Sequence, residues 1–280
     1  MDTIGVVGAG TMGCGIAQIF LENNYKVIFN DLNDTLVQKG IAVIINRLDR
    51  SLEKGKISIE TKNNILSRII PSEKLELFKE CSLIIEAVSE DLEIKKNLIK
   101  KLDEICGSTS VLASNTSSLS ITELSDASKH PEKVIGIHFF NPAPLIQLVE
   151  IIKGLKTSSE TFDIVSSYIL TVGKTPIKVE ESPGFIVNRL LIPMINEAVT
   201  ILAEGVAGTS EIDSAMKLGA NHPMGPLALA DLIGLDIVLA IMENLHNEMG
   251  DDKYRPHPLL KKMVRGRKLG KKTKTGFYEY

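Results

Sequence analysis

The sequence predicts an α/β protein, in which a doubly wound sheet is followed by a smaller all-α domain. Three observations support this prediction. A glycine-rich turn follows the first apolar segment, apolar segments then alternate with helix-like stretches, and the strand-like segments stop after Ser182-Pro183-Gly184. Such alternation is typical of a parallel sheet wrapped by helices. We therefore expect an α/β domain over residues 1–182 and a helical domain over residues 183–280.

The first strand, Ile4–Val7, leads into Gly8, Gly10 and Gly13 and then into a helix that ends near Asn23-Asn24. The spacing G-x-G-x-x-G in this context is a dinucleotide-binding turn. Gly8 allows the tight turn, Gly10 lets the backbone approach a pyrophosphate, and Gly13 lets the helix pack on the strand. The helix N-terminus then faces the phosphates. The first domain is therefore expected to be Rossmann-like.

The second strand, Lys26–Asn30, is followed directly by Asp31. A carboxylate at this position can accept hydrogen bonds from the adenosine ribose hydroxyls, and it would repel a 2′-phosphate. The neighbouring Leu32-Asn33-Asp34 offers no arginine to receive such a phosphate. The sequence therefore predicts NAD rather than NADP as the cofactor. An aspartate in an ordinary turn is the alternative interpretation.

Later apolar segments predict the rest of the sheet. Strands are expected at Leu83–Val88, Val111–Ala113, Val134–Ile137, Leu148–Ile152 and Ile177–Val179. The last two extend the sheet past the basic dinucleotide unit, with a helix around Glu160–Leu170 between them.

The C-terminal part shows helical patterns with Pro and Gly at their ends. Helices are expected at Phe185–Gly205, Ser210–Leu218, Pro226–Met249 and Pro258–Val264. Ser210-Glu211-Ile212-Asp213 resembles a capping box, with Asp in place of Glu or Gln, and Pro226 suits a first helical position. The apolar stretches Leu227–Ile233 and Ile237–Ile241 indicate either a subunit interface, which would make a homodimer, or an ordinary intrachain core.

Composition narrows the function classes. The hydrophobic content of 44%, net charge of −3 and absence of any long apolar run predict a soluble globular protein with neither a nucleic acid nor a membrane as partner. Met1-Asp2-Thr3 runs directly into the first strand and leaves no room for a signal peptide, so we expect a cytoplasmic protein. Cys14, Cys81 and Cys106 are spaced as reduced thiols, and the histidines show no metal-ligand spacing.

A candidate acid/base pair lies around the end of the Val134–Ile137 strand. His138 stands where this strand gives way to a loop with Pro142 and Pro144, and Glu150 is the only ionisable residue in the apolar stretch beyond it. If the two segments run antiparallel, His138 and Glu150 lie opposite each other. A buried carboxylate beside an imidazole holds one tautomer and stabilises the imidazolium, which suits general acid/base catalysis. A satisfied core ion pair is the alternative.

The chain resembles the L-3-hydroxyacyl-CoA dehydrogenase family over essentially its full length. The resemblance rests on several motifs in order: Gly8-Ala9-Gly10-Thr11-Met12-Gly13, Ser114-Asn115-Thr116-Ser117-Ser118, His138-Phe139-Phe140-Asn141-Pro142, Pro183-Gly184-Phe185-Ile186-Val187-Asn188-Arg189, His222-Pro223-Met224-Gly225-Pro226 and Gly276-Phe277-Tyr278. Several such motifs in one order are far more specific than the glycines alone.

This resemblance implies roles for individual residues. His138 would be the general base, Glu150 its orienting partner, and Ser117 and Asn188 would hydrogen-bond the substrate. Without the family, Ser117 is a loop serine and Asn188 an amide early in a helix. The remaining family positions fall into a cofactor set and a substrate set. NAD would contact the glycine turn with Thr11 and Met12, Asp31, Glu90, Lys95 and Asn115, and the substrate would also contact Asn141.

The CoA end of the substrate needs cationic partners. Arg47, Arg50 and Lys54 fall at i, i+3 and i+7 of a predicted helix, and Lys56 follows closely. This basic stripe suits the phosphates of CoA, with Lys54 first and then Arg50, although a charged helix face is usually solvated. Glu90 and Lys95 have a similar alternative, a solvated helix start.

The function implied by the resemblance is an NAD-dependent interconversion of (S)-3-hydroxybutyryl-CoA and acetoacetyl-CoA. Two rivals stay open. One is a related dehydrogenase that acts on a free hydroxy acid or sugar acid, and the other is a crystallin-like protein that binds the nucleotide without turnover.

Overall fold

The computed structural model, which describes residues 2–280, joins eight strands into one sheet. Their order across the sheet is β3-β2-β1-β4-β5-β6-β7-β8. The strands are β1 (Thr3–Val7), β2 (Lys26–Asn30), β3 (Ile69–Ser72), β4 (Leu83–Glu86), β5 (Val111–Ser114), β6 (Val134–Phe139), β7 (Leu148–Lys153) and β8 (Thr175–Glu180). The short β3, with its Pro71, is an edge strand that the sequence patterns did not indicate.

The strands from β3 to β6 are parallel, and β7 and β8 run the other way, because β6 pairs antiparallel with β7. The chain leaves β1 toward β2 and β3 and then returns to the other side of β1 with β4. Ligands of doubly wound sheets bind where the strand order reverses, outside the carboxyl ends of the strands. This geometry places the loops after β1 and β4 next to each other.

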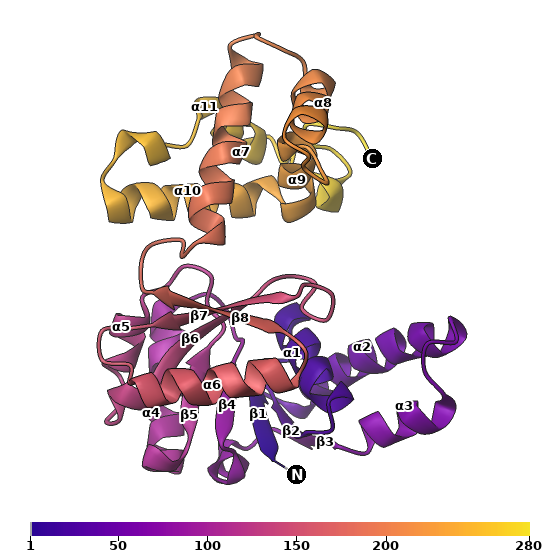
Figure 1. The fold of residues 1–280 in the computed structure, drawn as a ribbon, viewed down its shortest axis with the longest axis vertical. Coiled ribbons are helices and arrows are strands. Elements are labelled where there is room, and N and C mark those ends of the chain that lie inside the picture. The colour runs from indigo at the N-terminus through magenta and orange to yellow at the C-terminus, as the bar shows by residue number, and fades with distance from the viewer. Residues whose placement is uncertain (1) are drawn as a thin grey trace. The chain divides into compact units, whose positions relative to one another are not determined.

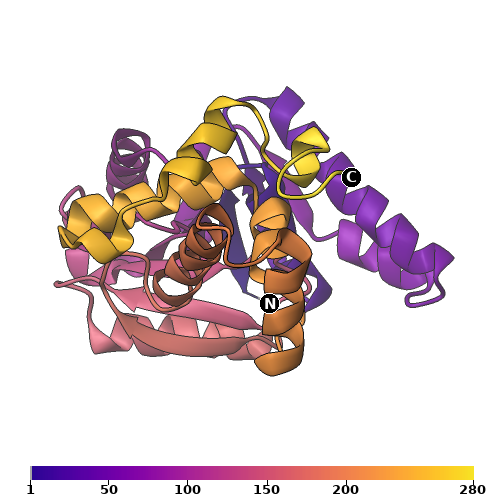
Figure 2. The same cartoon turned by 90° about the horizontal axis from the view of Figure 1, so that it is seen from above.

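Helices cover both faces of this sheet. They are α1 (Thr11–Glu22), α2 (Asp34–Glu53), α3 (Ile59–Leu66), α4 (Leu92–Cys106), α5 (Ile121–Ser125) and α6 (Ser159–Thr171), with short 3-10 turns at η1 (Leu75–Glu80), η2 (Gly107–Thr109) and η3 (Pro131–Lys133). The main apolar core joins α1, α2 and α6 to one face of the strands. Figure 1 shows α6 in front of the strands, and in Figures 1 and 2 the α2–α3 pair extends away from the sheet.

Several of these helices begin at a residue whose side chain caps the helix N-terminus. The side chains of Asn33, Asp91 and Ser158 accept hydrogen bonds from backbone N–H groups three residues later, at the starts of α2, α4 and α6. Such N-caps satisfy donors that have no intrahelical partner. The turn at Gly10, which begins α1, has no side-chain cap. This difference matters for the site described below.

The chain divides into two units, Met1–Glu181 and Ser182–Tyr280, and the second unit is helical. Its helices are α7 (Val187–Ala203), α8 (Thr209–Gly219), α9 (Pro226–Ile233), α10 (Leu235–Met249) and α11 (Pro258–Arg265), with 3-10 turns at η4 (Asp252–Tyr254) and η5 (Lys271–Thr273). The fold class predicted from the sequence, a Rossmann-like sheet followed by a helical domain, is confirmed.

Two details of the helical prediction are wrong. The expected helix Pro226–Met249 is two helices, because Gly234 adopts φ +106° and interrupts the helical hydrogen bonds between α9 and α10. The expected capping box at Ser210-Glu211-Ile212-Asp213 does not exist, since α8 already begins at Thr209 with Gly208 at its N-cap. Pro226 does occupy the first turn of α9, as predicted.

Asp213 serves another helix instead. Its buried carboxylate accepts hydrogen bonds from the backbone N–H groups of Leu227 and Ala228 at the start of α9, and from the Tyr278 hydroxyl at 2.8 Å. Asp231, also buried, accepts the backbone N–H groups of Phe277 and Tyr278. Burial and the bond to Asp213 raise the pKa of Tyr278. The motif Gly276-Phe277-Tyr278 thus has a structural role, in which it closes the helical unit.

The three cysteines lie inside the first unit. Cys14, Cys81 and Cys106 are buried and unpaired, and burial raises the pKa of Cys81 to about 12. Over residues 2–280, no group of three or more acidic, cysteine or histidine side chains is arranged to hold a metal ion. Nor does that part of the chain contain a helix with the length and apolar character needed to cross a membrane.

Candidate functional site

In the glycine-rich turn between β1 and α1, the glycines that the fold requires differ from the one that a ligand would require. Gly8 has φ +106°, and a Cβ there would lie 2.5 Å from the carbonyl oxygen of Ala87 after β4. A Cβ on Gly13 would overlap the Gly8 carbonyl oxygen at 1.7 Å. A Cβ on Gly10, in contrast, would meet nothing within 4 Å. The fold itself therefore requires Gly8 and Gly13, whereas the open space at Gly10 fits the approach of a phosphate.

The N-terminus of α1 supplies the donors for such a phosphate. Gly10 cannot cap the helix with a side chain, and Thr11 and Met12 lie in the first turn, where backbone N–H groups lack intrahelical partners. A helix N-terminus of this kind stabilises negative charge. The residues present thus fit the pyrophosphate of a dinucleotide.

Asp31 lies beside this turn, at the carboxyl end of β2. Its Oδ2 accepts a hydrogen bond of 2.7 Å from the backbone N–H of Ala9, and its Oδ1 accepts one of 2.7 Å from Leu32. The side chain thus braces the glycine turn and is partly exposed. A partly exposed carboxylate at the end of the second strand has the chemistry needed to accept ribose hydroxyls.

His138 and Glu150 face each other across β6 and β7. The antiparallel register pairs them directly, as the sequence pattern predicts, and His138 Nδ1 lies 2.8 Å from Glu150 Oε2. Glu150 is fully buried and His138 is 6% exposed, and the ring of Phe140 packs 4.3 Å from the imidazole. With Glu150 ionised, Nδ1 carries its proton toward the carboxylate, so proton exchange with a substrate falls to Nε2. The pair can therefore act as a general acid/base.

The loop after His138 is fixed by a lysine that sequence reasoning did not select. Lys174 is buried, and its Nζ donates hydrogen bonds to the carbonyl oxygens of Pro144 and Ile146 at 2.9 and 2.8 Å. Burial lowers the pKa of Lys174, although Glu22 opposes this shift. Asn141 lies exposed at the start of the same loop. Only a contact map could reveal this anchor, since Lys174 follows a helix far along the chain.

Glu90 holds the loop that contains Ser117. Its Oε1 accepts hydrogen bonds from the Ser117 backbone N–H at 2.8 Å, the Ser117 hydroxyl at 3.2 Å and the Thr116 hydroxyl at 2.6 Å. Burial raises the pKa of Glu90, but the Lys95 ammonium and these hydrogen bonds outweigh it, so the pKa lies below its ordinary value. Glu90 is therefore an ionised acceptor directly beside Ser117.

Lys95 and Asn115 connect this loop to the strands. Lys95 is fully buried, which rules out the solvated helix start as its environment, and its Nζ lies 3.3 Å from Glu90 Oε2 and 2.5 Å from Glu86 Oε1. Asn115 Oδ1 accepts a hydrogen bond from the backbone N–H of Phe139, next to His138. Glu86 was not predicted as a site residue, although it is the lone carboxyl in an apolar strand, as Glu150 is in its own strand.

The remaining predicted substrate contacts are Asn188, Arg50 and Lys54. Asn188 belongs to the second unit, where it lies in the first turn of α7 and is 9% exposed. On α2, Arg50 and the adjoining Lys54 are exposed, whereas Arg47 turns partly inward, and its Nη1 is buried without a hydrogen-bond partner among residues 2–280. The basic stripe is therefore divided, with Arg50 and Lys54 available to a ligand.

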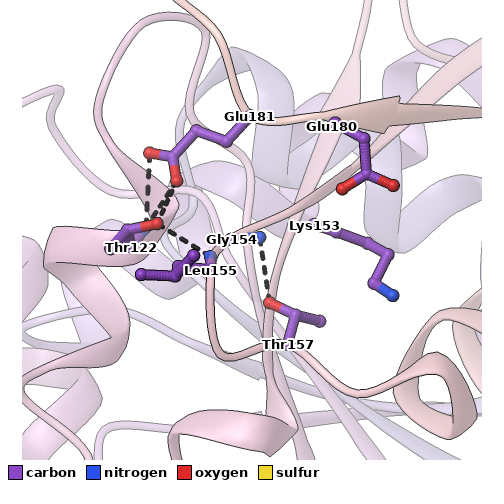
Figure 3. Close-up of a pocket in the computed structure, with 7 residues that line it drawn as sticks. All are labelled: Thr122, Lys153, Gly154, Leu155, Thr157, Glu180 and Glu181. Atoms are coloured by element: carbon purple, nitrogen blue, oxygen red, sulfur yellow. Dashed lines mark hydrogen bonds between the residues drawn. The ribbon is translucent and has the colours of Figure 1, made fainter.

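A separate pocket of about 300 Å³ lies in the first unit, at the far end of the β6–β7 pair from His138. Figure 3 shows that Glu181 points to Thr122 at the start of α5, where it accepts hydrogen bonds from the backbone N–H and the hydroxyl. Lys153 and Glu180 also line this pocket. It contains none of the predicted site residues, and its contacts fix the end of the first unit.

Comparison with known proteins connects both units to one family. The model of the 3-hydroxyacyl-CoA dehydrogenase NAD-binding domain matches residues 3–182, and that of the C-terminal domain matches residues 184–280. A 3-hydroxybutyryl-CoA dehydrogenase of Clostridioides difficile is 54% identical over 277 residues, which cover 99% of each chain. One of Bradyrhizobium diazoefficiens is 47% identical, over 99% of this chain and 94% of the relative.

A solved structure extends the likeness to three dimensions. The (S)-3-hydroxybutyryl-CoA dehydrogenase of Ralstonia eutropha superposes with a TM-score of 0.97 at 48% identity, over 100% of this chain and 99% of that one. Both family models, the full-length relatives and the fold agree. The chain therefore belongs to the 3-hydroxyacyl-CoA dehydrogenase family.

Proposed function

We propose that this protein is an NAD-dependent dehydrogenase that interconverts (S)-3-hydroxybutyryl-CoA and acetoacetyl-CoA. The observation that carries the proposal is the buried His138–Glu150 pair at the carboxyl end of β6. Because β1, β4, β5 and β6 are parallel, this pair lies on the same side of the sheet as the dinucleotide turn after β1. The assignment of the substrate is supported by relatives that match over nearly their full length and are named 3-hydroxybutyryl-CoA dehydrogenase. General acid/base chemistry and hydride transfer at one edge suit an alcohol and ketone pair.

The first unit supplies the proton chemistry of this reaction. NAD, when bound, would supply an acceptor for the hydride that leaves C3 of the hydroxyacyl chain. His138 Nε2 takes the proton from the 3-hydroxyl as the ketone forms, and Glu150 stabilises the resulting imidazolium through Nδ1. In the reductive direction the same imidazolium returns the proton to the ketone oxygen. Phe140 packs on the imidazole and limits its access to water.

Ser117 and Asn188 would hold the oxygens of the substrate, as the family resemblance implies. A hydroxyl or an amide can both donate and accept, so either can follow an oxygen that changes from alcohol to ketone. Glu90 supports Ser117 in this role by fixing its backbone N–H and hydroxyl. Asn141 in the loop after His138, and the exposed Arg50 and Lys54 near the end of α2, would bind the CoA thioester and its phosphates.

The preference for NAD over NADP rests on Asp31. Its carboxylate lies against the glycine turn and would repel a 2′-phosphate on the adjacent ribose. Glu90, Lys95 and Asn115 would serve the nicotinamide end, where their hydrogen bonds order the loops after β4 and β5.

The direct test is to incubate the purified protein with acetoacetyl-CoA and either NADH or NADPH, and to follow the loss of reduced cofactor by absorbance. Free acetoacetate is the control substrate. We expect rapid oxidation of NADH with the thioester alone. Turnover of free acetoacetate would favour a hydroxy-acid dehydrogenase, preference for NADPH would overturn the role of Asp31, and binding without turnover would favour a non-catalytic protein.

We also propose that the chain forms a homodimer through its helical unit. Large apolar side chains on this unit are exposed, with 71% of Leu190, 50% of Leu232 and 46% of Ile237 accessible to solvent. An intrachain core buries Leu227, Leu235 and Val238 but not these residues. Light scattering after gel filtration should give twice the chain mass of 30.6 kDa. A monomeric mass at micromolar concentration would contradict this proposal.

A further inference from the structure

Glu86 at the end of β4 and Lys95 on α4 form a buried ion pair. Glu86 is 2% exposed and Lys95 is fully buried, and their charged atoms are 2.5 Å apart. Glu86 Oε1 also accepts the backbone N–H of Val88 at 2.9 Å, while Oε2 accepts the Ser114 hydroxyl at 2.6 Å. Taking two charges out of water is costly, and such a pair contributes little net stability. Stability alone therefore gives a weak account of this arrangement.

The first connection from this pair runs to Ser117. The ammonium of Lys95 lies between two carboxylates, Glu86 on one side and Glu90 Oε2 on the other. Glu90 uses its second oxygen, Oε1, to accept both the backbone N–H and the hydroxyl of Ser117. The position of Glu90 relative to Ser117 thus depends on the position of Lys95. Glu86 holds the Lys95 ammonium, because the Lys95–Glu86 contact is shorter than the Lys95–Glu90 contact.

A second connection runs toward His138. The backbone carbonyl of Glu86 accepts the N–H of Asn115 at 2.7 Å, and Asn115 Oδ1 accepts the N–H of Phe139 at 3.1 Å. Glu86 is therefore bonded to Ser114 and Asn115 at the end of β5 and to Lys95 on α4, and it is linked to β6 only through Asn115. It is the common point of the two segments that present Ser117 and His138.

We propose that Glu86 is a positioning residue for this reaction, which acts through Lys95 and Glu90 on Ser117. The proposal rests on the proposed function, because Ser117 is taken to contact the substrate. Without the Glu86 charge, Glu90 is the carboxylate left to Lys95, and the ammonium moves toward it. Glu90 then turns from the Ser117 N–H toward Lys95. A displacement of about 1 Å in such a contact can lower the rate about 10²-fold.

The test is the Glu86→Gln variant, which keeps the shape of the side chain and removes its charge. We expect kcat for acetoacetyl-CoA reduction to fall about 10- to 100-fold, more than the affinity for NADH changes. The rate is measured per folded molecule, well below the melting temperature of the variant. A residue with a structural role alone would lower the melting temperature and leave this kcat unchanged.

Glu93→Gln is the matched control, because Glu93 is an acidic residue in the first turn of α4 whose side chain is 76% exposed. Its kcat should stay within about twofold of the wild type. If Glu86→Gln does not fold, the Ser114→Ala variant tests the positioning role instead, because it removes one hydrogen bond to Glu86 without a change of charge. A drop in kcat of about threefold or more would support the proposal.

If Glu86→Gln folds and its kcat stays within about twofold of the wild type, the positioning role is overturned. If Glu86→Gln does not fold, the same result for Ser114→Ala overturns it. The proposed function is judged separately, on the wild-type protein. A wild type without turnover of acetoacetyl-CoA and NADH would overturn the proposed function together with this inference. An active wild type with an equally active variant would overturn the inference alone.

Discussion

Replacement of His138 by alanine should lower kcat for acetoacetyl-CoA reduction about 10²- to 10⁴-fold, the usual contribution of a general acid or base. The variant removes the imidazole that lies 2.8 Å from the buried Glu150 carboxylate. The affinity for NADH should stay nearly intact, because the glycine turn and Asp31 lie on other strands. Steady-state kinetics and a fluorescence titration with NADH measure the two quantities.

A second histidine provides the control for this experiment. His130 Nδ1 lies 2.9 Å from Asp103, so it is also paired with a carboxylate, but it precedes β6 whereas His138 lies at its carboxyl end. His130→Ala should keep kcat within about twofold of the wild type. A His138→Ala enzyme with wild-type activity would refute the catalytic role, whatever the control shows.

Two alanine substitutions in the glycine turn should separate folding from cofactor binding. Gly13→Ala places a Cβ 1.7 Å from the Gly8 carbonyl oxygen, so the helix must move away from the strand. Overpacking of this kind costs about 1–3 kcal/mol or more, and NADH affinity should fall about 10²-fold as the turn deforms. Gly10→Ala meets no protein atom within 4 Å, so its melting temperature should match the wild type while NADH affinity falls at least about tenfold.

Thermal unfolding and NADH titration of both variants provide the measurement. Gly219→Ala, which adds a Cβ in open space at the end of α8, is the control that should change neither quantity. If Gly10→Ala binds NADH as tightly as the wild type, the phosphate does not approach that backbone, and the dinucleotide assignment of this turn is wrong.

The sequence predicted the parts of this molecule that depend on short-range patterns. The turn Gly8–Gly13, the strands other than β3, and the pairing of His138 with Glu150 all follow from residue types at fixed spacings. The pairing could be predicted because β6 and β7 are consecutive, so the loop between them determines which residues lie opposite. The chemical roles of these residues stay predictions, to be decided by the variants above.

Long-range contacts explain what the sequence could not provide. Asp213 looks like a capping residue for its own helix, yet its carboxylate turns to the backbone of Leu227 and to the Tyr278 hydroxyl. Glu86 and Lys95 form a pair only because β4 and α4 fold back on each other. The division of Pro226–Met249 depends on the backbone angle of one residue, Gly234, which apolar periodicity does not register.

The contacts of Asp213 and Asp231 bear on the order in which the two units can fold. The first unit has its last strand once Glu180 has been made, so its sheet can be completed while the rest is still in synthesis. The helical unit differs, because its two buried aspartates receive donors from Phe277, Tyr278 and Tyr280. Until residues 277–280 have packed, Asp231 lacks these donors and Asp213 keeps only the backbone N–H groups of Leu227 and Ala228, so the helical unit completes its buried contacts last.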